Sequence, residues 1–186
     1  MKSQALPLVR KERTKILMEL FEEKGNENYG EQVTQLQHAV QAATSARNKG
    51  YDPELIVAAF LHDVGHLLDE EEKMEELGNQ YHENLGADYL SNLGFSKRIQ
   101  SLVKNHVEAK RYLTAADKTY LRTLSSASLK TLSYQGGPMD DIEKENFEKD
   151  PFFKDHIRLR QLDDAAKVEN YTIGNIEWIW EMIDTI

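Results

Sequence analysis

The sequence predicts an all-α fold, a bundle of seven or eight helices that forms a single domain over residues 1–186. Apolar residues recur three and four positions apart along most of the chain, and no segment alternates between apolar and polar residues as a half-buried strand would. Residue types that typically begin helices precede several of these segments. The chain has 186 residues, of which 40% are hydrophobic and 30% charged, which is long enough and apolar enough for one hydrophobic core.

The first two predicted helices lie on either side of a polar turn. Apolar residues at helical spacing predict a helix over residues 12–23, and the segment 24–31, with its two glycines, predicts a turn. Thr34 and Gln37 then form the pattern of a capping box, in which each side chain bonds the backbone amide of the other residue. The second helix is therefore expected to begin after Thr34 and to end at Gly50.

The third predicted helix carries the most apolar stretch of the chain. Asp52 followed by Pro53 is typical of a helix start, with a capping side chain and a proline in the first position. The stretch AAFLHDVGHLL at residues 58–68 follows, and its apolar flanks predict that this helix is buried. The acidic run at residues 69–76 predicts a solvent-exposed segment.

The remaining elements are also predicted to be helical. Helices are expected over residues 82–92, ending before Gly94, and over residues 97–110, capped by Ser96, and Thr114 is expected to open the next one.

A loop is predicted at residues 133–140, which contain paired glycines and a proline. Asp150 and Pro151 are expected to begin a long helix that reaches Ala165, and the last helix is expected over residues 173–183.

Composition limits the function. The chain has no cysteine, so a metal site would have to be built from histidine, aspartate and glutamate. The net charge of −9 argues against nucleic acid as the main partner, although an anionic small molecule could still bind beside a few local lysines or arginines. No apolar run is long enough to cross a membrane, and the N-terminus lacks the apolar core of a secretory leader. A cytoplasmic protein without a membrane partner is expected.

His62 and Asp63 are the first candidates for a metal site. An adjacent histidine and aspartate inside an apolar helix are costly to bury unless they are paired or bind a metal. His66 lies one helical turn after His62 and is expected on the same side. It is either a further ligand or a residue that orients a ligand or faces the substrate.

The other histidines divide into two groups. His38, His82 and His106 lie in predicted helices with apolar neighbours, where each could be a hydrogen-bonded core residue or a metal ligand. His156 has charged neighbours and is predicted to lie on the surface. Asp163 could add a second carboxylate to the metal site, whereas the adjacent Asp164 is predicted to face water. Such ligands suit iron, manganese, zinc or nickel.

Two cations are predicted to lie beside these ligands. Lys110 follows His106 by one helical turn, and Arg160 precedes Asp163 by three residues, so each shares a helix face with a candidate ligand. Either residue could instead be a solvated helix charge. Together they would suit an anion such as a phosphonate, which arginine can bind through two hydrogen bonds.

The order of these residues resembles a known family. The arrangement of His38, His62-Asp63 and Asp163 is similar to the H…HD…D signature of the HD-domain superfamily, which is all-α, binds divalent metals and consists mostly of phosphohydrolases. A set of further motifs is similar to the HD-type mixed-valent diiron oxygenases that cleave organophosphonates: QLQHA at 35–39, AAFLHDVGH at 58–66, His82 with GADYL at 86–90, His106 with KRYL at 110–113, and QGG at 135–137. The resemblance covers residues 29–167, which would form the metal-binding core.

This resemblance implies a dinuclear iron enzyme. It implies two iron ions in the mixed-valent Fe(II)/Fe(III) state, with O2 as co-substrate and Asp63 as the bridging ligand. The implied iron ligands are His38, His62, Asp63, His82, His106 and Asp163. The implied reaction cleaves the C–P bond of a 1-hydroxy-2-aminoethylphosphonate-type substrate to give a carboxylate, which is glycine or an N-methylated analogue, and inorganic phosphate.

The resemblance also implies substrate contacts. The phosphonate is expected to contact Lys110, Ser128 and Arg160, and His66 is expected to contact the substrate. Of these residues, His66 and Lys110 are the expected catalytic ones. Glu31 is expected to pair with the substrate amine.

The family has a lid tyrosine three residues before this glutamate, a position held here by Asn28. The tyrosine of this chain is Tyr29, two residues before Glu31. Tyr29 is expected to take the lid role through a one-residue deletion in the loop.

Two other functions remain open from the sequence. An HD-domain phosphohydrolase would use a metal-bound hydroxide to attack a phosphate ester or nucleotide. A non-catalytic HD module would bind a ligand only, but it would be expected to lack one or more metal ligands, and none is missing here. The oxygenase reading also implies an upstream hydroxylase that would supply its substrate.

Overall fold

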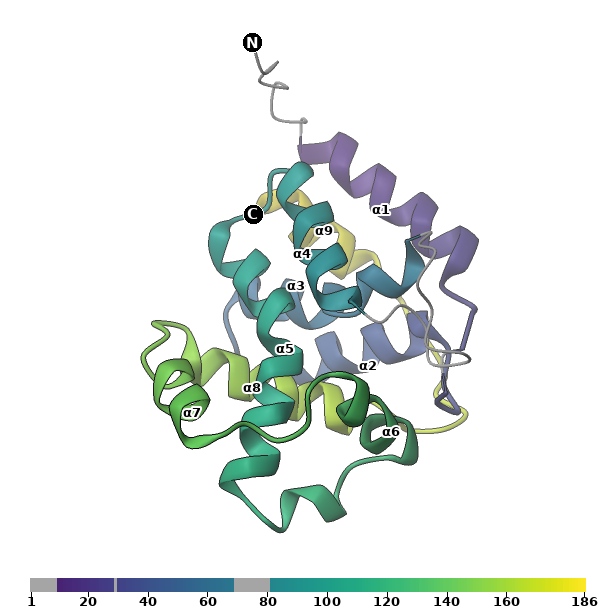
Figure 1. The fold of residues 1–186 in the computed structure, drawn as a ribbon. Coiled ribbons are helices and arrows are strands. Elements are labelled where there is room, and N and C mark those ends of the chain that lie inside the picture. The colour runs from purple at the N-terminus through teal and green to yellow at the C-terminus, as the bar shows by residue number, and fades with distance from the viewer. Residues whose placement is uncertain (1–9, 29, 69–80) are drawn as a thin grey trace.

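The computed structural model describes residues 10–28, 30–68 and 81–186, and in these ranges every regular element is helical (Figure 1). The α-helices are α1 (Arg10–Lys24), α2 (Gln35–Asn48), α3 (Pro53–Leu61), α4 (His82–Asn92), α5 (Lys97–Ala116), α6 (Ser126–Tyr134), α7 (Asp141–Phe147), α8 (Phe153–Ala165) and α9 (Glu177–Thr185). The described residues also form two 3-10 turns, η1 (Val64–Leu67) and η3 (Tyr120–Arg122). The all-α prediction is confirmed. Among the described residues, no helix is both long and apolar enough to span a membrane.

Helix α3 forms the centre of the core. Every residue from Leu55 to Leu61 is buried, and the helix packs against α2, α5 and α8. Burial of a large apolar side chain such as Phe60 stabilises the fold by about 1.5–3 kcal/mol. The predicted start is confirmed, because the Asp52 side chain accepts a hydrogen bond from the Leu55 amide and Pro53 occupies the first turn.

The other helices surround this core. Helix α4 packs against α5 and η1, and α1 packs against α9, near which the C-terminus lies in Figure 1. The capping box of α2 is confirmed: the Gln37 amide donates to Thr34 Oγ1 at 3.2 Å, and the Thr34 amide donates to Gln37 Oε1 at 3.0 Å.

Helix α3 ends earlier than predicted. The stretch at residues 58–68 is not one helix, because α3 ends at Leu61 and the chain turns at Asp63 into η1. The turn is closed by the His66 amide, which donates to the Asp63 carbonyl oxygen at 2.9 Å. Asp63 therefore lies at a bend, where its side chain can reach more than one helix.

The segment after residue 110 differs from the prediction in two places. Thr114 does not begin a helix but lies inside α5, where its hydroxyl donates to the Arg111 carbonyl oxygen at 2.8 Å. Helix α7 was not predicted, although Asp140 and Glu143 form a capping box at its start. Tyr29 and the acidic run at residues 69–76 lie outside the described residues.

Candidate metal centre and substrate pocket

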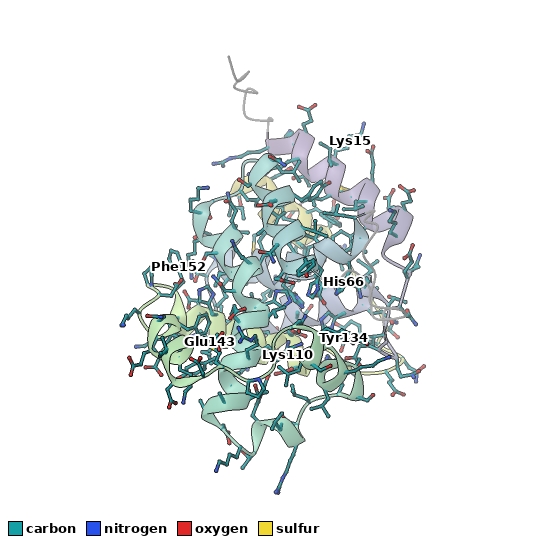
Figure 2. All side chains as sticks on the ribbon, viewed as in Figure 1. Lys15, His66, Lys110, Tyr134, Glu143 and Phe152 are labelled. Atoms are coloured by element: carbon teal, nitrogen blue, oxygen red, sulfur yellow. The ribbon has the colours of Figure 1, made fainter. Side chains whose placement is uncertain are left out.

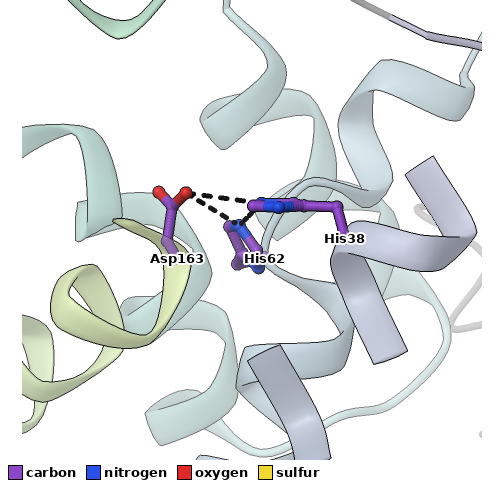
Figure 3. A group of neighbouring side chains, drawn as sticks. All are labelled: His38, His62 and Asp163. Atoms are coloured by element: carbon purple, nitrogen blue, oxygen red, sulfur yellow. Dashed lines mark hydrogen bonds and ion pairs between the residues drawn. The ribbon is translucent and has the colours of Figure 1, made fainter. Parts of the chain in front are cut away.

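Three helices bring His38, His62 and Asp163 together (Figure 3). His38 comes from α2, His62 caps the C-terminus of α3, and Asp163 comes from α8. The Nε2 atoms of the two histidines are 3.1 Å apart, and Asp163 Oδ1 lies 3.3 Å from His38 Nε2 and 3.8 Å from His62 Nε2. All three residues are buried, so they form a water-poor group of two nitrogens and one oxygen.

A second group consists of Asp63, His82 and His106, from the bend after α3, the start of α4 and the middle of α5. The Nε2 atoms of the two histidines are again 3.1 Å apart. Asp63 Oδ1 lies 3.5 Å from His82 Nε2 and 3.4 Å from His106 Nε2.

Asp63 connects the two groups. While its Oδ1 faces the second group, its Oδ2 lies 3.4 Å from both His38 Nε2 and His62 Nε2 in the first. One carboxylate thus presents one oxygen to each group, which is the arrangement needed to bridge two metal ions.

Backbone hydrogen bonds orient the rings of three of these histidines. His38 Nδ1 lies 2.9 Å from the Ala166 carbonyl oxygen, His62 Nδ1 lies 2.8 Å from that of Ala59, and His106 Nδ1 lies 2.7 Å from that of Val103. A carbonyl oxygen can only accept, so each Nδ1 carries the hydrogen and a neutral ring presents a lone pair at Nε2.

The donor atoms therefore fit a metal ion. In the first group, two Nε2 lone pairs and a carboxylate oxygen point toward one another. When both rings are neutral, no hydrogen lies between these three atoms, so their lone pairs repel one another. A cation bound between them would remove this repulsion. Two ligand atoms that each lie about 2.1 Å from one metal ion are about 3–3.5 Å apart, close to the separations found here. Imidazole and carboxylate donors suit iron as well as manganese, zinc and nickel.

The carboxylates give this centre a strong attraction for positive charge. Burial lowers the pKa of His62, but Asp63 and Asp163 outweigh it and raise that pKa to about 9. Burial raises the pKa of Asp163, but Arg160 and His38 outweigh it, so that pKa lies well below its usual range. Without a metal, the first group therefore attracts a proton to His62, whereas burial lowers the pKa of His82 in the second group.

A pocket opens onto this centre. Its open space, which includes solvent-filled space at the mouth, is about 590 Å³, and it is lined by five of the six residues of the two groups together with side chains from α5, α6 and α8. His66 also lines it, and the His66 ring stacks on that of His82 with 3.9 Å between centroids. Burial lowers the pKa of His66 to about 4, so this ring is neutral at neutral pH.

Lys110 lies at the inner wall of the pocket. It is buried on α5, in the middle of the helical body, whereas Lys15 and Glu143 lie at the periphery (Figure 2). Lys110 Nζ donates to Thr131 Oγ1 at 2.9 Å, and Ser128 lies one turn earlier on the same face of α6. Burial, and then the charge of Arg160, lower the pKa of Lys110 to about 7.

Arg160 also lines the pocket, but other residues hold its guanidinium group. Its Nη1 lies 2.8 Å from Asp163 Oδ2, its Nη2 contacts Asp164, and its Nε donates to the Tyr120 hydroxyl at 3.0 Å. The Tyr120 hydroxyl in turn donates to Asp164. The prediction that Asp164 faces water is wrong, because this carboxylate is half-buried and pairs with Arg160.

One cation of the pocket was not predicted from the sequence. Lys167 lies just after α8, and its Nζ donates to Glu31 Oε1 at 2.7 Å and to Ser128 Oγ at 2.9 Å. Its position four residues after Asp163 matches that of Lys110 after His106, and this spacing could have identified it.

Other predicted residues lie apart from the pocket. Asn28 is exposed and does not line it. The prediction that His156 lies on the surface is wrong: the residue is fully buried, its ring stacks on Phe147, and its Nε2 lies 3.2 Å from Asp150 Oδ1.

Comparisons with known proteins agree with this arrangement. The model of the HD domain matches residues 14–134, which include His38, both residues of the His62-Asp63 pair, His82 and His106. An uncharacterised protein of Acanthamoeba polyphaga mimivirus is 40% identical over 166 residues, which are 87% of this chain and 76% of the viral protein.

Two relatives have named activities. The [1-hydroxy-2-(trimethylamino)ethyl]phosphonate dioxygenase (glycine-betaine-forming) of Leisingera caerulea is 44% identical over 151 residues, 80% of this chain and 76% of that protein. The hydroxymethylphosphonate dioxygenase of Gimesia maris is 39% identical over 169 residues, 89% of this chain and 84% of that protein.

Proposed function

The chain belongs to the HD-domain oxygenase family, and from this premise we propose that it is an iron-dependent oxygenase that cleaves the C–P bond of a 1-hydroxyphosphonate. The proposed substrate is of the 1-hydroxy-2-aminoethylphosphonate type. In the balanced reaction, R–CH(OH)–PO3H2 and O2 give R–COOH and phosphoric acid. The substrate carbon is oxidised and dioxygen is reduced, so no further reductant is consumed.

The observation that carries this proposal is the position of Asp63 between the two groups. Its two oxygens lie 3.4–3.5 Å from four histidine nitrogens, two on each side. The donor set supports two metal ions, with His38, His62 and Asp163 at one, His82 and His106 at the other, and Asp63 shared. Two iron ions there would supply the redox chemistry that dioxygen requires and that amino-acid side chains lack.

The cations beside the centre support an anionic substrate. Lys110 donates a hydrogen bond to the Thr131 hydroxyl of α6, and Lys167 donates one to the Ser128 hydroxyl of the same helix. A phosphonate oxygen could take the place of either hydroxyl as the acceptor. Arg160 adds a positive charge fixed in place by Asp163 and Asp164. A phosphonate bound here would lie within reach of the centre, because the same side chains line one pocket.

His66 is suited to contact the substrate without carrying charge. Its ring faces the pocket beside His82 and is neutral at neutral pH. A neutral imidazole can donate one hydrogen bond and accept another, so it can orient a substrate hydroxyl. It adds no positive charge beside metal ions.

Phosphate release by iron-loaded protein tests the proposal. We expect (R)-2-amino-1-hydroxyethylphosphonate, its N-trimethylated analogue or hydroxymethylphosphonate to release phosphate only when dioxygen is present. Each molecule of phosphate should accompany one molecule of carboxylate and consume one molecule of dioxygen. The matched control is His62→Ala, which lacks one proposed ligand and should release none.

Two other results would indicate one of the alternative functions instead. Oxygen-independent release of phosphate from phosphomonoesters or nucleotides, with no turnover of the three phosphonates, would indicate an HD-domain phosphohydrolase. Tight binding of a phosphonate without turnover in either condition would indicate a binding module.

A further inference from the structure

Lys167 connects the two ends of the pocket. Its Nζ donates to Ser128 Oγ at 2.9 Å, on the side where the phosphonate is proposed to bind, and to Glu31 Oε1 at 2.7 Å, on the side where an amine is expected. Ser125 Oγ also donates to Glu31 Oε1, at 2.6 Å. Both contacts therefore fall on the same carboxylate oxygen of Glu31.

This arrangement changes what the Glu31 end can bind. A free carboxylate would attract any substituted ammonium group, but the Glu31–Lys167 pair has no net charge. The side chains of both residues are largely covered, with 24% and 18% exposed, so solvent screens the pair only partly. A substrate that carries a cation near Glu31 must therefore approach Lys167 as well, whereas a substrate without a cation meets no such repulsion.

We propose that Lys167 is a specificity-determining residue, which lowers the preference of the pocket for cationic 1-hydroxyphosphonates relative to amine-free ones by pairing with Glu31. The inference rests on the proposed function of the same pocket. Substrates divide into three classes by their chemistry. A primary ammonium can donate hydrogen bonds to Glu31, a trimethylammonium offers charge but no such bond, and a hydroxymethylphosphonate offers neither.

A simpler role for Lys167 would be to bind the phosphonate alone. Its contact with Ser128 fits that role, and loss of the lysine would then weaken all 1-hydroxyphosphonates to the same extent. The contact with Glu31 predicts something different, namely that the loss depends on the charge of the substrate. The ratio of affinities between substrates separates the two roles, because a shared loss of phosphonate binding cancels in that ratio.

The test compares dissociation constants of iron-loaded protein for the three substrates in the absence of dioxygen. In Lys167→Met, which keeps an unbranched side chain that is one atom shorter and removes its charge, we expect the affinity ratio of each cationic substrate over hydroxymethylphosphonate to rise about tenfold or more. Glu31→Gln should lower the same ratio. Lys118→Met, which removes an exposed lysine outside the pocket, is the matched control for net charge and should leave the ratio unchanged.

The outcomes are distinct. A ratio in Lys167→Met within about twofold of the wild-type value, with iron content intact, would overturn the inference. Loss of iron in that variant would also overturn it, because Lys167 would then support the metal centre. If wild-type protein binds the phosphonates but does not release phosphate with dioxygen, the proposed reaction is refuted. The affinity ratio would still decide the role of Lys167.

Discussion

Replacement of Gly65 by alanine should remove one of the two proposed metal ions and leave the other. A Cβ atom at this position would lie 1.9 Å from the His82 carbonyl oxygen, 2.7 Å from the His82 carbonyl carbon and 2.9 Å from the Gly86 nitrogen. Ordinary contact begins at 3.4 Å, so η1 and the start of α4 must separate by about 1.5 Å. These neighbours are backbone atoms, which cannot rotate out of the way.

This displacement exceeds what a metal site tolerates. Ligand distances in such sites vary by about 0.2 Å, and His82 would move relative to Asp63 by several times that amount. We expect Gly65→Ala to bind about one metal ion per chain at the His38, His62 and Asp163 group. Overpacking of this kind also destabilises a fold by about 1–3 kcal/mol, which should lower the melting temperature.

Metal analysis after iron loading, together with thermal unfolding, measures both effects. Gly174→Ala is the matched control, since a Cβ there meets no atom within 4 Å and both quantities should keep their wild-type values. Two tightly bound metal ions per chain in Gly65→Ala would refute the reasoning. They would mean that His82 is not a ligand or that its position does not depend on η1.

Three further predictions concern the same pocket. His62→Ala should lose metal from the first group, and full occupancy in elemental analysis would contradict its role as a ligand. Because burial lowers the pKa of Lys110 to about 7, this lysine loses its proton as the pH rises through 7. The phosphonate affinity measured by calorimetry should therefore fall above that pH. Lys110→Met should abolish this pH dependence. Tyr120→Phe removes the hydrogen bond to Arg160 Nε and should raise the KM for the phosphonate about tenfold with metal content unchanged; an unaltered KM would show that Arg160 needs no such support.

Local signals in the sequence were sufficient for much of the fold. The starts of α2 and α3 follow from capping side chains that act within one turn, and the apolar stretch up to Leu61 correctly indicated the core. The boundary of α5 was wrong because Thr114 can cap a helix or lie inside one, and only the surrounding contacts decide.

His156 illustrates a different source of error. The charged residues Lys154, Asp155 and Arg158 suggested an exposed position, but residues one or two positions apart point to different faces of a helix. Charges at those positions are therefore compatible with a buried histidine between them, as the structure shows.

The metal centre was accessible to sequence reasoning only through pattern and resemblance. The spacing of Lys110 and Arg160 relative to candidate ligands correctly placed both beside the centre. The pairing of Lys167 with Glu31 joins residues 136 positions apart, and no local pattern can indicate a contact at that separation. Such contacts depend on how α8 and the loop before α2 meet in space.

The wide spacing of the two groups along the chain has a consequence for assembly. Their six members extend from residue 38 to residue 163, so a chain still being synthesised cannot complete the centre until α8 has emerged. Closing such long loops is entropically unfavourable and slows folding. Metal ions that bind the complete fold but not the unfolded chain would raise the free energy of unfolding as their free concentration rises. The stability of the fold would thus increase with the supply of the metal.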